Sequence, residues 1–137
     1  MAVNSRAKGK RGELEAAAKL RELFGWSSAS RAAQHKAAED AADLNVAETP
    51  DLWWEVKRVA RLNVPQTMRE AAAACGRRCP VLLHRRDREA DWLLTIRLQD
   101  LPRVTHAYES ALYKTGSDET LVAEDVSVPN VGGNQGR

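Results

Sequence analysis

One segment decides the fold that this sequence predicts: Asp51-Leu52-Trp53-Trp54-Glu55-Val56-Lys57-Arg58. Aromatic and β-branched residues favour a β-strand, in which successive side chains point to opposite faces. One face would carry Leu52, Trp54 and Val56. The other would carry Trp53, Glu55 and Lys57. The segment therefore predicts a rigid strand that is apolar on one side and holds a carboxylate beside an amine on the other.

Taken alone, Glu55 and Lys57 favour an ordinary surface strand that carries one ion pair between neighbours on the same face. The preceding segment supports a more specific interpretation. Residues 43–46, Asp-Leu-Asn-Val, predict a short strand, and residues 47–50 predict the turn of a hairpin. Folding the chain about residue 49 places Asp43 opposite Glu55, where paired β-carbons lie about 5 Å apart. Two carboxylates at that separation can bind one divalent cation.

The alternative acid is Asp51, which follows Pro50. Asp51 lies four residues before Glu55 on the same strand, which corresponds to roughly 13 Å and is too far to share a metal ion. This alternative requires the strand to break, so that Asp51 curls back toward Glu55. Asp43 is therefore assigned to the predicted site and Asp51 to the turn.

The N-terminal part predicts a basic arm followed by a helix. Residues 1–11 are polar and basic and are expected to be mobile. Good helix formers dominate residues 12–24, and Glu13 lies on the same helical face as the apolar residues. Glu13 could contribute to a site or only complement the helix dipole. Glu15 is expected to face solvent beside Lys19.

The remaining elements complete an α/β domain. We expect a faint strand within residues 26–33, a helix from Asn63 to Gly76, and strands over residues 80–84 and 92–98. The sheet then has about five strands flanked by helices. The folded domain is expected to span residues 12–102. A short helix over residues 106–114 and a disordered tail are expected to follow it.

Composition restricts the class of partner. The 137 residues fit one domain, and Lys and Arg outnumber Asp and Glu by 18 to 14 in residues 1–102. This mildly basic body suits a polyanion better than a membrane, and no apolar run is long enough to span a bilayer. We expect a cytoplasmic protein in which Cys75 and Cys79 are reduced structural thiols.

The order of these features resembles the PD-(D/E)XK nuclease superfamily. The chain is similar to archaeal and phage Holliday junction resolvases over about residues 6 to 100. The residues that carry the resemblance are Lys10-Arg11-Gly12-Glu13, Asp43, Glu55-Val56-Lys57-Arg58, Pro80-Val81-Leu82-Leu83-His84-Arg85-Arg86 and Trp92-Leu93-Leu94-Thr95. The motif is short, so its specificity comes from this combination in order. The resemblance implies a restriction-endonuclease-like fold with a central mixed sheet.

The same resemblance implies Mg²⁺-dependent phosphodiester hydrolysis that leaves 5′ phosphates, with Mn²⁺ as a possible substitute. Asp43, Glu55 and the backbone carbonyl of Val56 would hold the ion, Glu13 would help to hold a second ion or its waters, and Lys57 would polarise the attacking water. Candidate DNA contacts are Arg6, Lys8, Lys10, Arg11, Arg31, Lys36, Arg58, Arg85 and Arg86.

The expected substrate is branched DNA, above all the four-way junction. The expected assembly is a homodimer, because a two-fold enzyme can nick two opposed strands. Two alternatives remain. One is a DNA-binding module that keeps the fold without catalysis, and the other is a nuclease for other branched or flapped DNA.

Overall fold

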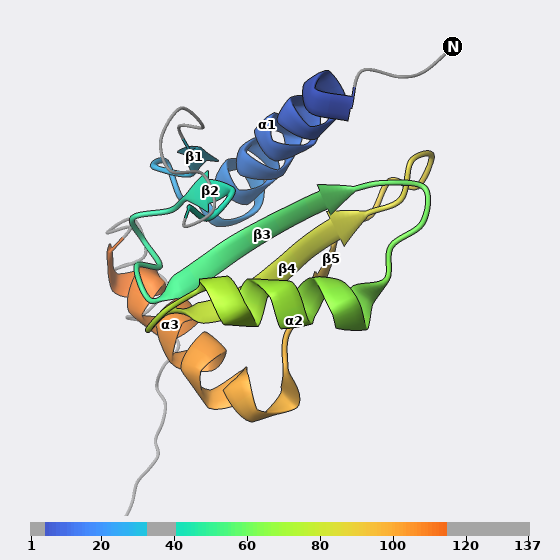
Figure 1. Ribbon diagram of the computed structural model, residues 1–137. Coiled ribbons are helices and arrows are strands. Elements are labelled where there is room, and N and C mark those ends of the chain that lie inside the picture. The colour runs from blue at the N-terminus through green and yellow to red at the C-terminus, as the bar shows by residue number, and fades with distance from the viewer. Residues whose placement is uncertain (1–4, 33–40, 115–137) are drawn as a thin grey trace, which may run out of the picture.

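The computed structural model describes residues 5–32 and 41–114 and forms an α/β domain. The elements in chain order are α1 (Ser5–Phe24), β1 (Ser30–Arg31), β2 (Leu44–Asn45), β3 (Leu52–Arg58), α2 (Val64–Ala74), β4 (Cys79–Arg85), β5 (Leu93–Thr95), the 3₁₀ helix η2 (Leu98–Asp100) and α3 (Leu101–Lys114). Figure 1 shows the two long strands, β3 and β4, crossing the middle of the molecule.

The sheet has five strands in the order β1-β2-β3-β4-β5. Strands β3 and β4 are parallel, and the other neighbouring pairs are antiparallel. Antiparallel neighbours can be joined by short turns, whereas a parallel pair needs a longer crossover, which α2 supplies here. The expected mixed sheet flanked by helices is confirmed.

Helices cover both faces of the sheet (Figure 1). Alternate β3 side chains, Leu52, Trp54 and Val56, pack in the main core with residues of α1 and α3. Trp53 points the other way and packs against Ala71 of α2 and against Cys75, the residue that caps this helix. The strand alternation predicted from the sequence is therefore confirmed. Helix α2 covers the second face of β3 along part of the strand.

The helix expected after Asn63 is also confirmed. The Asn63 side chain accepts a hydrogen bond from the backbone N–H of Gln66 at 3.1 Å and caps α2, and Pro65 occupies the first turn. Cys75 and Cys79 are free thiols and are both buried. Within the described ranges, no helix has the length and apolar character that a membrane span requires.

The prediction of a mobile arm is wrong for residues 5–11, which form the first turns of α1. A contact distant in sequence holds this part of the helix, because Lys8 Nζ lies 2.7 Å from Asp87 Oδ2 in the turn after β4. Gly12 allows close packing, since a β-carbon at this position would lie 3.1 Å from Cβ of Arg58. Residues 1–4 lie outside the described ranges.

The C-terminal boundary predicted at residue 102 is also wrong. Helix α3 starts at Leu101, and Ala107 and Ala111 are buried in the main core, so the domain extends to at least Lys114. Pro102 is compatible with the helix because it lies in the first turn. The strand expected over residues 92–98 is shorter, since β5 ends at Thr95. The tail expected to be disordered lies outside the described ranges.

Candidate functional site

The hairpin register brings Asp43 level with Glu55. Strand β2 pairs with β3 so that Leu44 lies opposite Trp54, which is the register predicted from the sequence. The backbone N–H of Asp43 donates to the carbonyl oxygen of Trp54 at 2.9 Å. A buried hydrogen bond of 3.0 Å from Trp54 Nε1 to Thr49 Oγ1 fixes the intervening turn. Local hydrogen bonds thus position both acids.

Asp43 is held against the edge of β3. Its Oδ2 accepts a hydrogen bond of 2.8 Å from the backbone N–H of Val56. The pKa of Asp43 is raised to about 6, chiefly by burial and also by the nearby charge of Glu13, while the Val56 hydrogen bond acts in the opposite direction. Asp43 is therefore a carboxylate whose negative charge is poorly solvated by the protein alone.

Glu55 is the second acid with a raised pKa. Burial is the main cause, followed by the charge of Asp43. Trp53 Nε1 donates to Glu55 Oε1 at 3.1 Å, and Lys57 Nζ lies 3.8 Å from Glu55 Oε2. The amine and the indole orient Glu55, and neither removes the unfavourable interaction between the two carboxylates. A cation placed between them would remove it.

Glu13 reaches this region from α1. Arg31 Nε donates to Glu13 Oε1 at 2.7 Å, and the Glu13 side chain is only 14% exposed. Glu13 therefore faces inward, as predicted, with Arg31 as its partner. A pocket of about 380 Å³ opens beside the contact between α1 and the end of β3. It is lined by Lys8, Gly9, Gly12, Glu13, Asp43, Val56, Lys57, Arg58 and Val59. Glu55 does not line this pocket.

The donor chemistry fits a hard divalent cation, although the ligands do not form a closed cage. Among residues 5–32 and 41–114, no group of three His, Cys, Asp or Glu side chains converges as metal ligands. Mg²⁺, however, commonly uses one or two carboxylates and completes its shell with waters and substrate phosphates. Asp43 and Glu55 suit that open form, whereas Glu13 is occupied by Arg31.

The predicted DNA contacts fall into two groups. Lys8, Arg31, Arg58 and Arg85 form ion pairs within the protein. Arg6, Lys10, Arg11 and Arg86 are exposed. Of the exposed group, Arg86 alone has an ion-pair partner within the described ranges, Glu89 at 3.8 Å. Lys36 lies outside these ranges.

Glu15 and Asp87 form an ion network that the sequence analysis missed. Glu15 binds Arg85 at 2.9 Å and Arg58 at 3.4 Å, and Asp87 lies 3.7 Å from Arg58. The expected pairing of Glu15 with Lys19 is wrong, because Lys19 pairs with Glu22. No local pattern could have revealed the network, since Glu15 is 43 residues from Arg58 and 70 from Arg85.

Asp51 lies outside the site. It is exposed at the start of β3, and Arg103 Nη2 lies 3.0 and 2.9 Å from its two carboxylate oxygens. His84 is a neighbour that was not assigned to the site. It is aligned with Lys57 on the adjacent parallel strand, and its Nε2 lies 2.9 Å from Thr95 Oγ1. Burial lowers the pKa of His84, which favours the neutral form of the ring.

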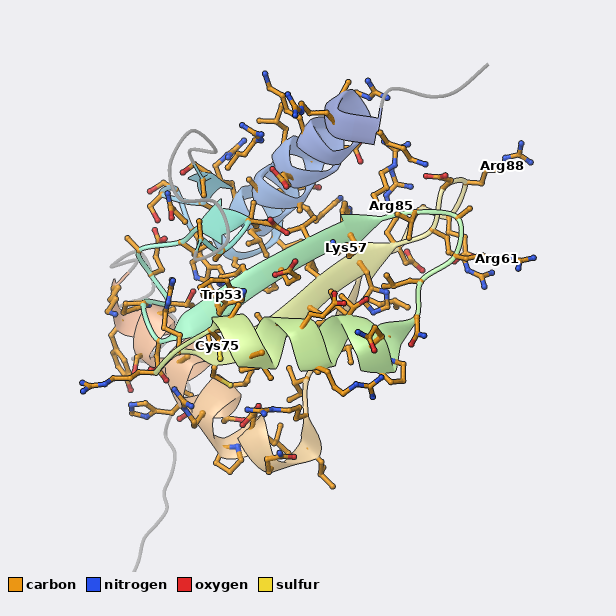
Figure 2. All side chains as sticks on the ribbon, viewed as in Figure 1. Trp53, Lys57, Arg61, Cys75, Arg85 and Arg88 are labelled. Carbon is orange, nitrogen blue, oxygen red and sulfur yellow. The ribbon has the colours of Figure 1, made fainter. Side chains whose placement is uncertain are left out.

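Comparison with protein families, curated proteins and solved structures finds no match to this chain. The function must therefore be inferred from the chemistry of the site. Figure 2 shows where that chemistry is concentrated: Lys57 lies on β3, and Arg61, Arg85 and Arg88 surround the end at which β3 and β4 finish.

Proposed function

We propose that this protein is a metal-dependent, structure-selective DNA endonuclease of the restriction-endonuclease-like class, with the four-way junction as its preferred substrate. One observation carries the proposal. Asp43 is level with Glu55 and accepts a hydrogen bond from the backbone N–H of Val56, and Lys57 follows Glu55 on β3. Asp43 and Glu55 are half-buried acids with raised pKa values beside an amine. Such an arrangement is typical of a site whose charges are balanced only when a cation and a phosphate bind.

In this proposal the residues of the chain have separate roles. Asp43 and Glu55 would hold Mg²⁺, or Mn²⁺ in its place. The bound ion would supply charge neutralisation at the scissile phosphate and a water of lowered pKa. Lys57 would orient the attacking water and the phosphate, since its side chain is 39% exposed and its Nζ lies 3.8 Å from Glu55 Oε2, too far for a tight ion pair. Glu13, with its charge partnered by Arg31, would support Asp43 from the side.

The exposed cations of α1 would contact phosphates. A homodimer would then present two such sites to opposed strands of a junction, and hydrolysis would leave 5′ phosphates. A second candidate function is a DNA-binding module without catalysis. The Glu13–Arg31 ion pair favours it, because this pair keeps Glu13 from completing a three-carboxylate cage.

The test uses purified protein with end-labelled four-way junction, flap and linear duplex, each with and without Mg²⁺. We expect Mg²⁺-dependent nicks on opposed strands of the junction, with 5′ phosphates and little cutting of linear duplex. Equal cutting of junction and duplex would contradict the selectivity, and preferred cutting of the flap would reassign the substrate. Junction binding without cutting in Mg²⁺ or Mn²⁺ would establish the binding module.

A further inference from the structure

We infer that Arg61 and Arg88 form a separate phosphate-contact site, which grips the backbone of a duplex arm beyond the cutting site. The inference rests on the proposed function, and it assigns a role to two arginines that are not among the candidate DNA contacts named above. Arg61 lies in the connection from β3 to α2, and Arg88 lies in the turn from β4 to β5. Both side chains are exposed.

The topology brings these two arginines to one edge of the sheet. Strands β3 and β4 are parallel, so the segments that follow them emerge at the same end. Figure 2 shows Arg61 and Arg88 at that end, with their guanidinium groups directed away from the domain. Between the two segments lies an open hollow of about 430 Å³ that is lined by Ala60, Arg86, Asp87, Arg88 and Glu89.

The hollow is lined by two arginines and two acids, and Arg61, next to Ala60 in the chain, adds a further positive charge at its edge. Its two acids are already partnered: Asp87 lies 2.7 Å from Lys8 and 3.7 Å from Arg58, and Glu89 lies 3.8 Å from Arg86. Within residues 5–32 and 41–114, by contrast, neither Arg61 nor Arg88 has an ion-pair or hydrogen-bond partner for its guanidinium group. Two unpaired guanidinium groups flanking a concave surface suit the phosphates of a nucleic acid backbone.

The backbone of Arg88 provides an independent observation. Arg88 has φ of 80°, and it is the one residue other than glycine with positive φ in the described part of the chain. Its turn is closed by a bond of 3.1 Å from Glu89 N to Arg86 O. Glycine or asparagine is favoured in this conformation, and arginine is strained there. Because its guanidinium group has no ion-pair or hydrogen-bond partner in the described part of the chain, the strain is consistent with a role in binding.

This assignment also separates two kinds of basic residue near the site. Arg58 and Arg85 are held by Glu15, so they brace α1 against the sheet. Arg61 and Arg88 are free to meet a ligand. The deeper pair is therefore structural, and the outer pair is the one that a duplex would reach first.

The test measures binding of the full-length chain to a fluorescent four-way junction by anisotropy, without divalent metal, at several NaCl concentrations. The variants are Arg61→Ala, Arg88→Gly and their combination. Each removed phosphate contact should reduce the slope of log affinity against log salt by about 0.9, and the double variant by about twice that. The matched control is Arg77→Ala, an exposed arginine before β4 at the opposite end of the sheet, which should leave the slope unchanged.

A second readout makes the test independent of folding defects. Arg88→Gly relieves a strained backbone, so its melting temperature should not fall even though its DNA affinity does. A lowered melting temperature would overturn the argument from strain. If the wild-type protein binds the junction and the two arginine variants keep its salt slope, the outer site is wrong while the proposed function stands. If the wild-type protein does not bind the junction, both are wrong.

Discussion

The carboxylate of Asp43 accepts a hydrogen bond from the backbone N–H of Val56, with 2.8 Å between Oδ2 and N. Strand β2 is only two residues long, and Leu44 pairs with Trp54. The Asp43 side chain therefore takes the place of a backbone partner for Val56, which lies beyond the paired residues of β3. This bond fixes the acid in a half-buried position where its pKa is raised to about 6. A structural contact and an unfavourable charge are thus combined in one side chain.

The raised pKa predicts that Asp43 destabilises the fold when it is charged. The folded state holds the proton more tightly than the unfolded chain, for which the ordinary pKa is 3.8. Protonated Asp43 therefore contributes to stability at low pH, and this contribution is lost as the pH rises from about 4 to about 6. Asp43→Asn, which keeps an acceptor for Val56, should raise the free energy of unfolding at pH 7.5 by on the order of 1 to 3 kcal/mol.

Chemical denaturation at pH 4, 6 and 7.5 measures this effect. The gain from Asp43→Asn should shrink toward zero near pH 4. Asp51→Asn is the matched control, because Asp51 is exposed and bound by Arg103, and its substitution should give no gain at pH 7.5. A gain from Asp43→Asn that stays constant across this range would contradict the raised pKa.

Mg²⁺ should stabilise the wild-type protein even without DNA. An ion that binds only the folded state raises its stability by RT ln(1 + [L]/Kd), about 2.7 kcal/mol at a hundredfold excess over Kd. We expect the melting temperature of the wild-type protein to rise as MgCl₂ is titrated and that of Asp43→Asn to stay level. Asp51→Asn should respond like the wild type. Identical shifts in all three proteins would show that the ion binds elsewhere.

The same two substitutions separate the acids in cleavage. Asp43→Asn should reduce single-turnover junction cleavage by at least about 100-fold, the upper end of what the loss of an outer-shell partner costs at a metal site. Binding of the junction should persist. Asp51→Asn should cleave at close to the wild-type rate. An inactive Asp51→Asn beside an active Asp43→Asn would show that the hairpin acids are not the metal ligands.

Local sequence signals predicted the central part of this fold. Alternation along β3, the turn about residue 49 and the Asn63 cap each act over a few residues, and the structure has all three. The two wrong boundaries have a common cause. Residues 5–11 and the first turns of α3 lack a strong local signal, and contacts from distant segments stabilise them, such as Lys8 with Asp87.

In the site, too, local signals were predictable and contacts between distant segments were not. The alignment of Asp43 with Glu55 follows from hairpin register and could be predicted. The partners of the charged residues could not, because an ion pair such as Glu15 with Arg85 depends on how α1 packs across the sheet. The prediction of Arg31 and Arg58 as DNA contacts considered only their charge, whereas the structure gives each of them an acidic partner.

Two glycines of α1 provide a test of its packing. A glycine in a helix interior costs roughly 0.5 to 1 kcal/mol relative to alanine. Nothing lies within 4 Å of a β-carbon built at Gly9, so Gly9→Ala should raise the free energy of unfolding by about that amount. At Gly12 the new β-carbon would meet Cβ of Arg58 at 3.1 Å, so Gly12→Ala should lose this gain and lower stability. Equal stabilisation by both variants in urea denaturation would show that α1 lies farther from β3.

The last prediction concerns Arg31, which either contacts phosphate or serves as the partner of Glu13. The bond of 2.7 Å between Arg31 Nε and Glu13 Oε1 favours the second role. A double-mutant cycle of Glu13→Gln and Arg31→Gln should then give a coupling energy of at least about 0.5 kcal/mol in unfolding experiments, because the two substitutions remove the same interaction. The salt dependence of junction binding should stay unchanged in Arg31→Gln, whereas a phosphate contact would reduce the slope by about 0.9. Additive stability effects together with a reduced slope would make Arg31 a DNA contact and leave Glu13 available as a third metal ligand.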